Sequence, residues 1–341
     1  MNIRTSRRHL FFTVFIVTVL FVTGVNAQGP VRVKIGMVAP KGSIYHRVVQ
    51  EIGEDWREEQ AGKLKFTVYT DSRQGSEADM VRRMRVGQLN GAMLTVVGLS
   101  EIDDSVAALQ KMPMMFRSWA ELDYVRERIR PILEQRLADK GFIVLFWGEG
   151  GWVQFFAKRP MAMPGEYREA KIFAWSGDTD MVALMKSLKY TPVVLELSDI
   201  LPGLQTDLID VVPAAPMFAL TGQFDRSAPF MLRVNWVPIV GATIITKTTW
   251  DSMTASVQAQ VKASSREAEN AVRLHRDTLD DKSIRAMQKR GLTVRELTPE
   301  IAAAWQHLAE NSYDWIRGKS VPADLFDRVV ELLAEFRASE P

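Results

Sequence analysis

The sequence predicts an α/β fold with mainly parallel sheets in two lobes, on three observations. Strand-like and helix-like patterns alternate from Val31 onward, as is typical of α/β proteins. Glycines at 148, 150 and 151 interrupt this pattern, and a new alternating set follows them. An amphipathic stretch begins at Thr254 and keeps one apolar face until Gly291. At about 1.5 Å per residue, such a helix is long enough to bridge two lobes.

The expected first lobe opens with a βαβαβ pattern. Apolar residues alternate in strands and recur every three or four residues in helices, which places strands at 31–37, 63–70, 93–97 and 142–147 and helices at 44–56, 76–86 and 118–140. The third strand is apolar throughout and bounded by Gly91 and Gly98, as expected of a strand buried on both faces. Ser118 and Glu121 have the spacing of a capping box, which satisfies free backbone amides at a helix start.

A second set of segments follows the glycines, and we place the boundary between the lobes there. Its strands are expected at 152–157, 171–175 and 192–197. Thr298 and Pro299 start another helix, since proline at the first helical position loses no hydrogen bond. We assign residues 31–150 plus 240–280 to lobe I and residues 151–239 plus 281–341 to lobe II. Ligands of such folds usually bind at the carboxyl ends of the strands.

The first residues have the form of an export signal. Three arginines precede the apolar run Leu10–Val22, and small residues lead to Ala27. An apolar helix of this length reaches about 20 Å, short of the roughly 30 Å of a hydrocarbon core, which favours a cleaved signal peptide, residues 1–27, over a membrane anchor. Both the general secretory and the twin-arginine routes stay open. Cleavage near Ala27 removes three arginines and no acidic residue, so the formal charge changes from +2 to −1. We expect the mature protein in the periplasm.

Composition and motifs argue against an enzyme, a metal site or a nucleic-acid partner. With 43 basic and 41 acidic residues, the chain has no charge excess for binding nucleic acid. It contains no cysteine and four histidines, none of them at paired metal-ligand spacing. The glycines near 150 lack the lysine and hydroxyl residue of a phosphate-binding loop, and no G-x-S-x-G sequence is present. We therefore expect no catalytic residue and no cofactor.

Aromatic residues gather around the expected lobe boundary: Trp147, Trp152, Phe155, Phe156, Phe173 and Trp175. Their position beside glycines and strand ends favours a cleft between the lobes. Large aromatic side chains also dominate buried cores, so core packing is the competing interpretation.

Several short stretches follow one another in a specific order: Val68-Tyr69-Thr70 with Gln74-Gly75-Ser76-Glu77, Met112 to Arg117, Lys158-Arg159-Pro160, Leu204 to Asp210, and Thr249 to Ser252. The second is similar to Pro-Phe-Leu-Phe, the fourth to Leu-Gln-x-Gly-x-Val-Asp and the last to Phe-Trp-Asp-Ser. In order and spacing they resemble the periplasmic solute-binding subunit of TRAP transporters, the DctP-like family. The resemblance covers nearly the whole mature chain.

This resemblance implies a two-lobe periplasmic binding protein fold with a long lobe-bridging helix. It also implies that the protein closes on a small-molecule ligand and delivers it to TRAP membrane permease subunits, without catalysis. Family members usually bind a substrate carboxylate with an arginine in a Lys-Ile-Arg-Val strand, and this position is Phe173 here. A second family arginine is replaced by Val153. The positions of a family asparagine and of a polar residue on the first strand fall at Ala214 and Val38.

These departures predict a hydrophobic or uncharged ligand, because a buried carboxylate without a partner is costly whereas buried apolar surface is favourable. The residues expected to line the site are Val38, Thr95, Trp147, Trp152, Val153, Gln154, Phe173, Trp175, Ser176, Leu197, Ala214 and Met217. Of these, we expect the polar residues Thr95, Gln154 and Ser176 to orient the ligand.

Three alternatives stay open. The arginine role could have moved to Arg117 or Arg226, which would keep the ligand a carboxylate. The chain could instead be a non-transporting docking or sensing protein with a periplasmic partner protein. A periplasmic enzyme would need a polarised acid, base or metal in the cleft.

Overall fold

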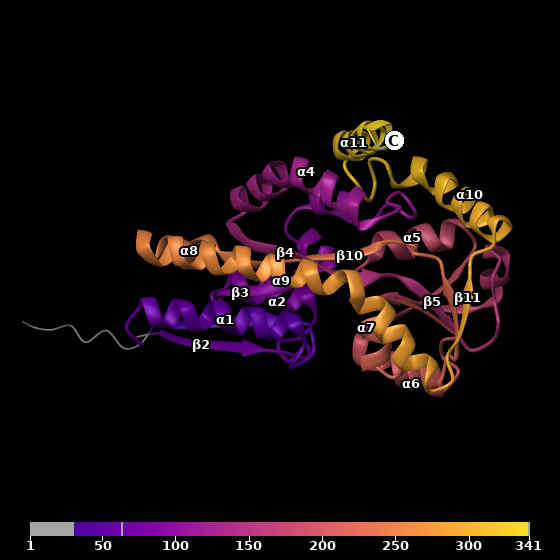
Figure 1. The fold of residues 1–341 in the computed structure, drawn as a ribbon, viewed down its shortest axis with the longest axis horizontal. Helices are drawn as coiled ribbons and strands as arrows, with labels where there is room; N and C mark the ends of the chain where they lie inside the picture. The colour runs from indigo at the N-terminus through magenta and orange to yellow at the C-terminus, as the bar shows by residue number, and fades with distance from the viewer. Residues whose placement is uncertain (1–30, 63, 340–341) are drawn as a thin grey trace, which may run out of the picture.

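Two β-sheets with helices packed around them form the two lobes of the protein (Figure 1). The computed structural model describes residues 31–62 and 64–339, and the expected signal peptide lies outside these residues. The strand orders are β2-β1-β3-β10-β4 and β11-β9-β5-β8-β6-β7. This arrangement confirms the predicted two-lobe α/β architecture. Within the described residues, no helix combines the length and the apolar character needed to cross a membrane.

Lobe I is built around the first sheet. Its elements are β1 (Val31–Met37), α1 (Ile44–Glu59), β2 (Leu64–Tyr69), α2 (Glu77–Arg85), β3 (Gly91–Thr95), α3 (Val96–Ser100), the 3₁₀ helix η1 (Asp104–Leu109), α4 (Trp119–Asp139), β4 (Phe142–Trp152), β10 (Pro238–Thr246) and α8 (Lys247–Asp251). Strand β1 pairs in parallel with β2 and β3, which confirms the βαβαβ pattern. Val96 and Val97, expected in a strand, instead start α3, because the Thr95 hydroxyl accepts a hydrogen bond from the Val97 amide.

Lobe II is built around the second sheet. Its elements are β5 (Gln154–Ala157), the 3₁₀ helix η2 (Pro164–Glu169), β6 (Lys171–Trp175), α5 (Thr179–Ser187), β7 (Thr191–Leu195), the 3₁₀ helix η3 (Leu197–Asp199), α6 (Ile200–Gln205), β8 (Val211–Ala214), α7 (Pro216–Thr221), the 3₁₀ helix η4 (Phe224–Arg226), β9 (Phe230–Arg233), β11 (Thr293–Glu296) and α10 (Pro299–Ile316). Strand β6 pairs in parallel with β7 and β8, whereas β5 is antiparallel to β8 and β9.

Both sheets are therefore mixed rather than mainly parallel. In lobe I, β10 is antiparallel to both of its neighbours, β3 and β4. Strands β5 and β10 each follow directly after a crossing between the lobes, and each enters its sheet against the direction of its neighbours. The prediction missed this because the direction of a strand depends on its connections and not on its own residues.

The glycines at the lobe boundary lie within a strand instead of ending it. Strand β4 continues to Trp152 and pairs with β10, with Gly148 opposite Gly241. The chain then crosses to lobe II, where Val153 and Val237 of the two crossing segments are joined by a backbone hydrogen bond of 2.8 Å. Gly151 has a φ of +104°, and a Cβ at this position would lie 2.3 Å from an Asp280 carboxylate oxygen. Only glycine fits this crossing without strain.

A single long helix, α9 (Ala255–Gln288), spans 34 residues and bridges the lobes (Figure 1). It begins as predicted, because the Thr254 hydroxyl accepts a hydrogen bond from the Val257 amide. The helix packs against α1 and β4 in lobe I and against α7 in lobe II. The predicted lobe-bridging helix is thereby confirmed.

The last helix, α11 (Ala323–Ser339), packs against α4 and η1 of lobe I and lies beside α4 in Figure 1. Helix α11 thus contacts lobe I, whereas the sequence-based assignment places all of residues 281–341 in lobe II. Arg337 of α11 binds the Glu121 carboxylate and donates to the Met115 carbonyl. These contacts join α11 to the start of α4. Glu121 also accepts from the Arg117 amide, so its carboxylate does not bind Ser118 as the predicted capping box required.

Candidate functional site

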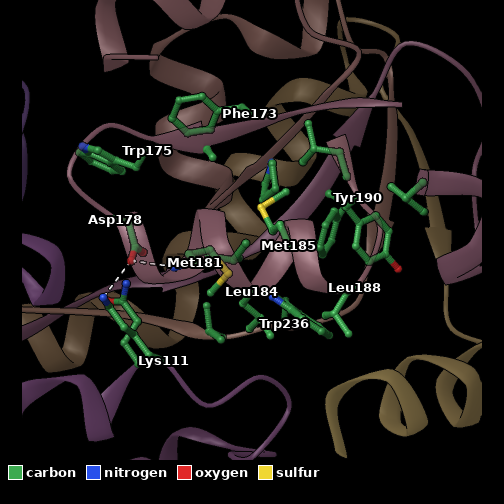
Figure 2. A pocket seen from close by; sticks show the side chains of 18 of the residues that line it. Lys111, Phe173, Trp175, Asp178, Met181, Leu184, Met185, Leu188, Tyr190 and Trp236 are labelled. Atoms are coloured by element: carbon green, nitrogen blue, oxygen red, sulfur yellow. Dashed lines mark hydrogen bonds and ion pairs between the residues drawn. The ribbon is translucent and has the colours of Figure 1, made fainter. Parts of the chain in front are cut away.

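An apolar cavity of about 160 Å³ lies at the junction of the lobes (Figure 2). Strand β6 contributes Phe173 and Trp175, and α5 contributes Met181 and Met185. The rest of the wall comes mainly from other apolar and aromatic side chains, among them Val153, Ile172, Leu184, Leu188, Tyr190, Trp236 and Trp305. A wall of this composition favours the burial of apolar ligand surface.

Phe173 lies at the middle of β6, opposite Val193 of β7. Its side chain is 6% exposed and forms part of the wall of the apolar cavity. The parallel strands β7 and β8 on either side hold β6 in place. Phe173 therefore faces the interlobe cavity.

One part of the cavity wall is polar. Gln110 and Lys111 extend from lobe I, and Asp178 stands in lobe II as the N-cap of α5. The Lys111 Nζ lies 2.8 Å from Asp178 Oδ1, and the two side chains are only 7% and 12% exposed. This buried ion pair joins the lobes.

A second space of about 450 Å³, the cleft mouth, lies between the lobes next to the apolar cavity. Trp175 lines both spaces. Four carboxylates line the cleft mouth: Asp71, Glu77, Asp79 and Glu196. Among the described residues that line it, none is a lysine or an arginine. The negative lining disfavours an anionic ligand.

Glu77 is the most buried of these carboxylates, with 3% exposure. It accepts hydrogen bonds from the Thr95 amide at 2.5 Å and from the Thr95 hydroxyl at 2.8 Å. Burial nevertheless raises the pKa of Glu77 to about 7, and the hydrogen bonds from Thr95 only partly offset this shift. Glu196 raises it further by charge repulsion.

A third, smaller cavity of about 50 Å³ is lined mainly by lobe I residues and shares Ile239 with the apolar cavity. Its lining includes Val38, Thr95, Glu149 and Thr243. The Thr243 hydroxyl is buried without a hydrogen-bond partner among the described residues. The volume suits water better than a larger solute.

The structure brings several of the predicted site residues to these spaces. Val153, Phe173 and Trp175 line the apolar cavity. Val38, Trp175 and Leu197 line the cleft mouth. Val38 and Thr95 line the small cavity, and Ser176 lines a recess beside Glu77. The Thr95 hydroxyl is engaged by Glu77 and the Val97 amide, which limits its use for a ligand.

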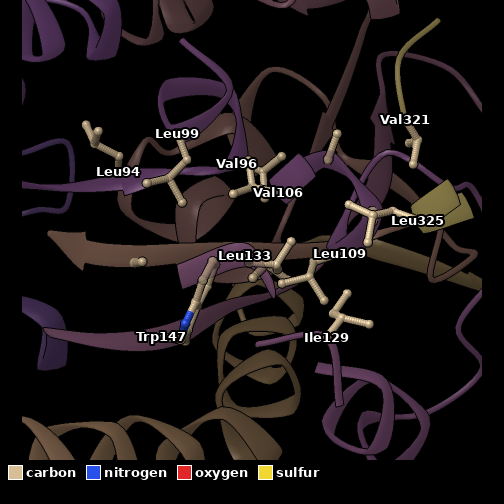
Figure 3. Packing of buried hydrophobic residues seen from close by; sticks show 14 of the residues in the cluster. Leu94, Val96, Leu99, Val106, Leu109, Ile129, Leu133, Trp147, Val321 and Leu325 are labelled. Carbon is tan, nitrogen blue, oxygen red and sulfur yellow. The ribbon is translucent and has the colours of Figure 1, made fainter. Parts of the chain in front are cut away.

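Two of the predicted tryptophans belong to the core instead. Trp147 is fully buried beneath α4, and its indole nitrogen donates to Glu134 at 3.0 Å (Figure 3). Trp152 packs on Trp119 with ring centroids 4.7 Å apart. Neither residue lines the three spaces described above, so the competing interpretation of core packing holds for both.

Three other predicted residues are also occupied by packing. Gln154 donates to the Asn235 side chain at 2.7 Å and accepts from the Asn235 amide at 3.0 Å, so its amide group is already paired. Ala214 packs in the core of lobe II, and Met217 packs with the cluster under α9. None of the three lines the described spaces.

The two arginines considered as relocated carboxylate ligands lie elsewhere. Arg117 and Arg226 are both exposed and line none of these spaces. Arg117 precedes α4, and Arg226 is the last residue of η4. Neither is placed to bind a ligand in the cavities described here.

The polar part of the wall was not among the predicted site residues. Gln110, Lys111 and Asp178 carry no local pattern of a binding site, although Asp178 has the helix-capping preference of its residue type. The contact between Lys111 and Asp178 spans 67 positions. Only the packing of the two lobes brings them together.

Comparison with known proteins places this geometry in a family. Residues 35–319 match the bacterial extracellular solute-binding proteins of family 7, DctP. The chain is 22% identical over 255 residues to the C4-dicarboxylate-binding periplasmic protein DctP of Rhodobacter capsulatus, covering 74% of this chain and 76% of that protein.

Solved structures have the same fold. A TRAP periplasmic solute-binding protein from Xanthobacter autotrophicus with bound β-D-galacturonate is 21% identical, with a TM-score of 0.80 over 89% of this chain and 99% of that one. A TRAP periplasmic solute-binding protein from Sulfurospirillum deleyianum with bound succinate is 19% identical, with a TM-score of 0.80 over 88% and 98%.

The match extends over most of the chain and confirms the resemblance to TRAP-type periplasmic solute-binding proteins. Proteins of this kind bind small molecules and work with membrane permease subunits, and they are not enzymes. The chain belongs to family 7 of the bacterial extracellular solute-binding proteins, the DctP family.

Proposed function

We propose that this protein binds a hydrophobic or uncharged small molecule between its lobes and presents it to TRAP membrane permease subunits. The observation that carries the proposal is the position of Phe173. Its ring stands in the wall of the apolar cavity, where the resembling family has an arginine that binds a carboxylate.

The charges around the cavities support an uncharged ligand. Among the described residues that line the apolar cavity, the cleft mouth and the small cavity, none is an arginine. The single lysine, Lys111, is already paired with Asp178. A buried carboxylate without a cation is strongly unfavourable, and carboxylates of the cleft mouth, such as Asp71 and Glu196, add to this cost.

The apolar wall of the cavity favours an apolar ligand. Fully burying one apolar side-chain-sized group contributes about 1.5–3 kcal/mol. A dry apolar cavity of about 150 Å³ accepts a single benzene ring, and the apolar cavity here measures about 160 Å³. A compact apolar molecule with one ring therefore suits it.

The similar solved structures named above contain galacturonate and succinate, both organic acids. At 19–21% identity, this likeness concerns the fold. The residues lining the apolar cavity of this chain are mainly apolar, so we assign its ligand from its own side chains.

Transport needs only that the ligand favour the closed arrangement of the lobes, which a permease can then recognise. We propose the periplasm as the site of action, after removal of residues 1–27. The protein exported from a bacterial host should begin at Gln28, as measured by its intact mass. Retention of residues 1–27 would argue for an anchored protein instead.

The test is a titration with ethylbenzene and, as an acid comparison, succinate, on the mature protein by isothermal calorimetry. Ethylbenzene should bind saturably and succinate should not. Phe173→Arg should abolish ethylbenzene binding, because a buried guanidinium destroys the apolar wall.

The matched control is Val194→Arg on the neighbouring strand β7, where the side chain is 50% exposed. It introduces the same charge outside the cavity and should leave ethylbenzene binding intact. Binding of succinate in preference to ethylbenzene would contradict the proposal.

A further inference from the structure

The apolar cavity has one polar region, formed by Gln110 and Lys111 of lobe I and Asp178 of lobe II. The three residues are 6–9% exposed, so water reaches them poorly. Figure 2 shows Lys111 and Asp178 at one end of the drawn side chains, with Leu188 and Tyr190 at the other. The cavity is therefore polar at one end and apolar at the other.

Some hydrogen-bond donors at the polar end have no acceptor among the described residues. The Lys111 ammonium has three N–H groups, and within the described part of the chain it makes one hydrogen bond, to Asp178. Gln110 Oε1 accepts from the Val240 amide at 2.8 Å. The Gln110 Nε2 group has no acceptor among the described residues. Both side chains line the cavity and carry donors that no described residue uses.

Asp178 determines which acceptor can use these donors. Its carboxylate balances the charge of Lys111 at 2.8 Å, and Asp180 lies 3.8 Å from the same Nζ. An anionic group next to Lys111 would also lie next to Asp178, which repels it. A neutral oxygen acceptor, such as a carbonyl, gains the hydrogen bonds without this repulsion.

We infer that the ligand is a neutral amphipathic molecule with an apolar ring and one carbonyl-type acceptor, and that Lys111 is a specificity-determining residue that binds this acceptor. The inference rests on the proposed function and narrows its ligand class. The acceptor points to lobe I, and the ring lies against Phe173 in lobe II.

This orientation links recognition to closure. The apolar wall belongs mainly to lobe II, whereas the donors of Gln110 and Lys111 belong to lobe I. A ligand that contacts both groups has more interactions when the lobes are together. Its acceptor therefore stabilises the closed arrangement more than a plain hydrocarbon does.

The test compares two molecules of nearly the same shape, acetophenone, which has a carbonyl, and ethylbenzene, which has none, with benzoate as the anionic analogue. Calorimetry on the mature wild-type protein should show acetophenone binding about tenfold more tightly than ethylbenzene, as expected for a hydrogen bond to a charged donor. Benzoate should bind more weakly than acetophenone.

The variant Lys111→Met keeps the unbranched side chain, one atom shorter, and removes its donors, so the affinity ratio of acetophenone to ethylbenzene should fall to about one. Because this change leaves Asp178 unpaired, the double variant Lys111→Met with Asp178→Asn is measured as well and should show the same loss of preference. Lys247→Met, in an exposed ion pair with Asp251, is the control and should keep the wild-type ratio.

The outcomes separate the two claims. Equal affinities for acetophenone and ethylbenzene in the wild type, or a ratio unchanged in both Lys111 variants, would overturn the inference and leave the proposed function standing. Failure of both neutral molecules to bind, or tightest binding of benzoate, would overturn both.

Discussion

Lys111 and Asp178 form an ion pair of 2.8 Å between the two lobes, at the wall of the apolar cavity. The pair places a cation where the ligand would bind and neutralises it in the same place. This cavity therefore differs from one that binds an acid, in which the cation would be unpaired and free to bind the ligand's carboxylate.

Asp178→Asn should convert the site to anion binding. Asparagine caps a helix as well as aspartate does, so α5 keeps its start. Lys111 then keeps only the Asp180 carboxylate, 3.8 Å from its Nζ, as a counter-charge, and benzoate affinity should rise about tenfold over the wild type. Calorimetric titration with benzoate measures the change. An unaltered benzoate affinity would show that Asp178 does not control the charge preference.

Arg126→Met should destabilise the protein strongly. The Arg126 guanidinium is fully buried and forms an ion pair with Glu149, which is 1% exposed. Glu149 also forms an ion pair of 3.4 Å with Arg276 of α9. Loss of this cation leaves Glu149 short of charge compensation, at a cost of about 3–5 kcal/mol. Urea unfolding followed by circular dichroism gives the change.

Lys247→Met serves as the comparison for Arg126→Met, because its ion pair with Asp251 is about half exposed. Its loss should cost no more than about 0.5 kcal/mol. Equal stability of the two variants would mean that the network around Glu149 contributes little to holding α4, β4 and α9 together.

Gly151→Ala should destabilise the crossing between the lobes. The φ of +104° is strained for alanine, and the new Cβ would lie 2.3 Å from Asp280 Oδ1 and 3.1 Å from the Ala215 Cβ. We expect a loss of about 1–3 kcal/mol in the free energy of unfolding. Gly165→Ala is the control, since nothing lies within 4 Å of its Cβ position. Equal thermal unfolding midpoints for the two variants would contradict the prediction that alanine is strained at position 151.

Glu77 should make stability fall with rising pH. Its pKa in the folded protein is about 7, above the ordinary 4.5, so the folded state holds a proton that the unfolded state has released. Protonated Glu77 therefore contributes up to about 3 kcal/mol to the free energy of unfolding. This contribution is fully present below about pH 4.5 and is lost as the pH rises to about 7.

Glu77→Gln cannot ionise and should lack this part of the pH dependence. Relative to the wild type, the variant should gain stability between pH 5 and pH 7.5, as measured by urea unfolding at both values. Asp280, whose pKa burial raises to about 7, is present in both proteins and cancels in the comparison. A difference between the two proteins that does not change with pH would mean that Glu77 ionises normally.

The elements of the fold were predictable because their signals are local. Apolar periodicity and a capping hydroxyl act within a few residues, so the strand at 171–175 and the helix after Thr254 followed from the sequence alone. The resemblance to the family was equally visible, since it depends on short motifs and their order. The family, and with it the two-lobe architecture, could therefore be predicted from the sequence.

The composition of the site was decided by tertiary structure. Trp147 and Trp175 look alike as residues beside a lobe boundary, yet one is fully buried in the core and the other lines the cleft. Lys111 meets Asp178 only because two lobes close on one another. Packing and ion pairs between distant segments depend on how whole elements are arranged in space, and no stretch of a few residues encodes that arrangement.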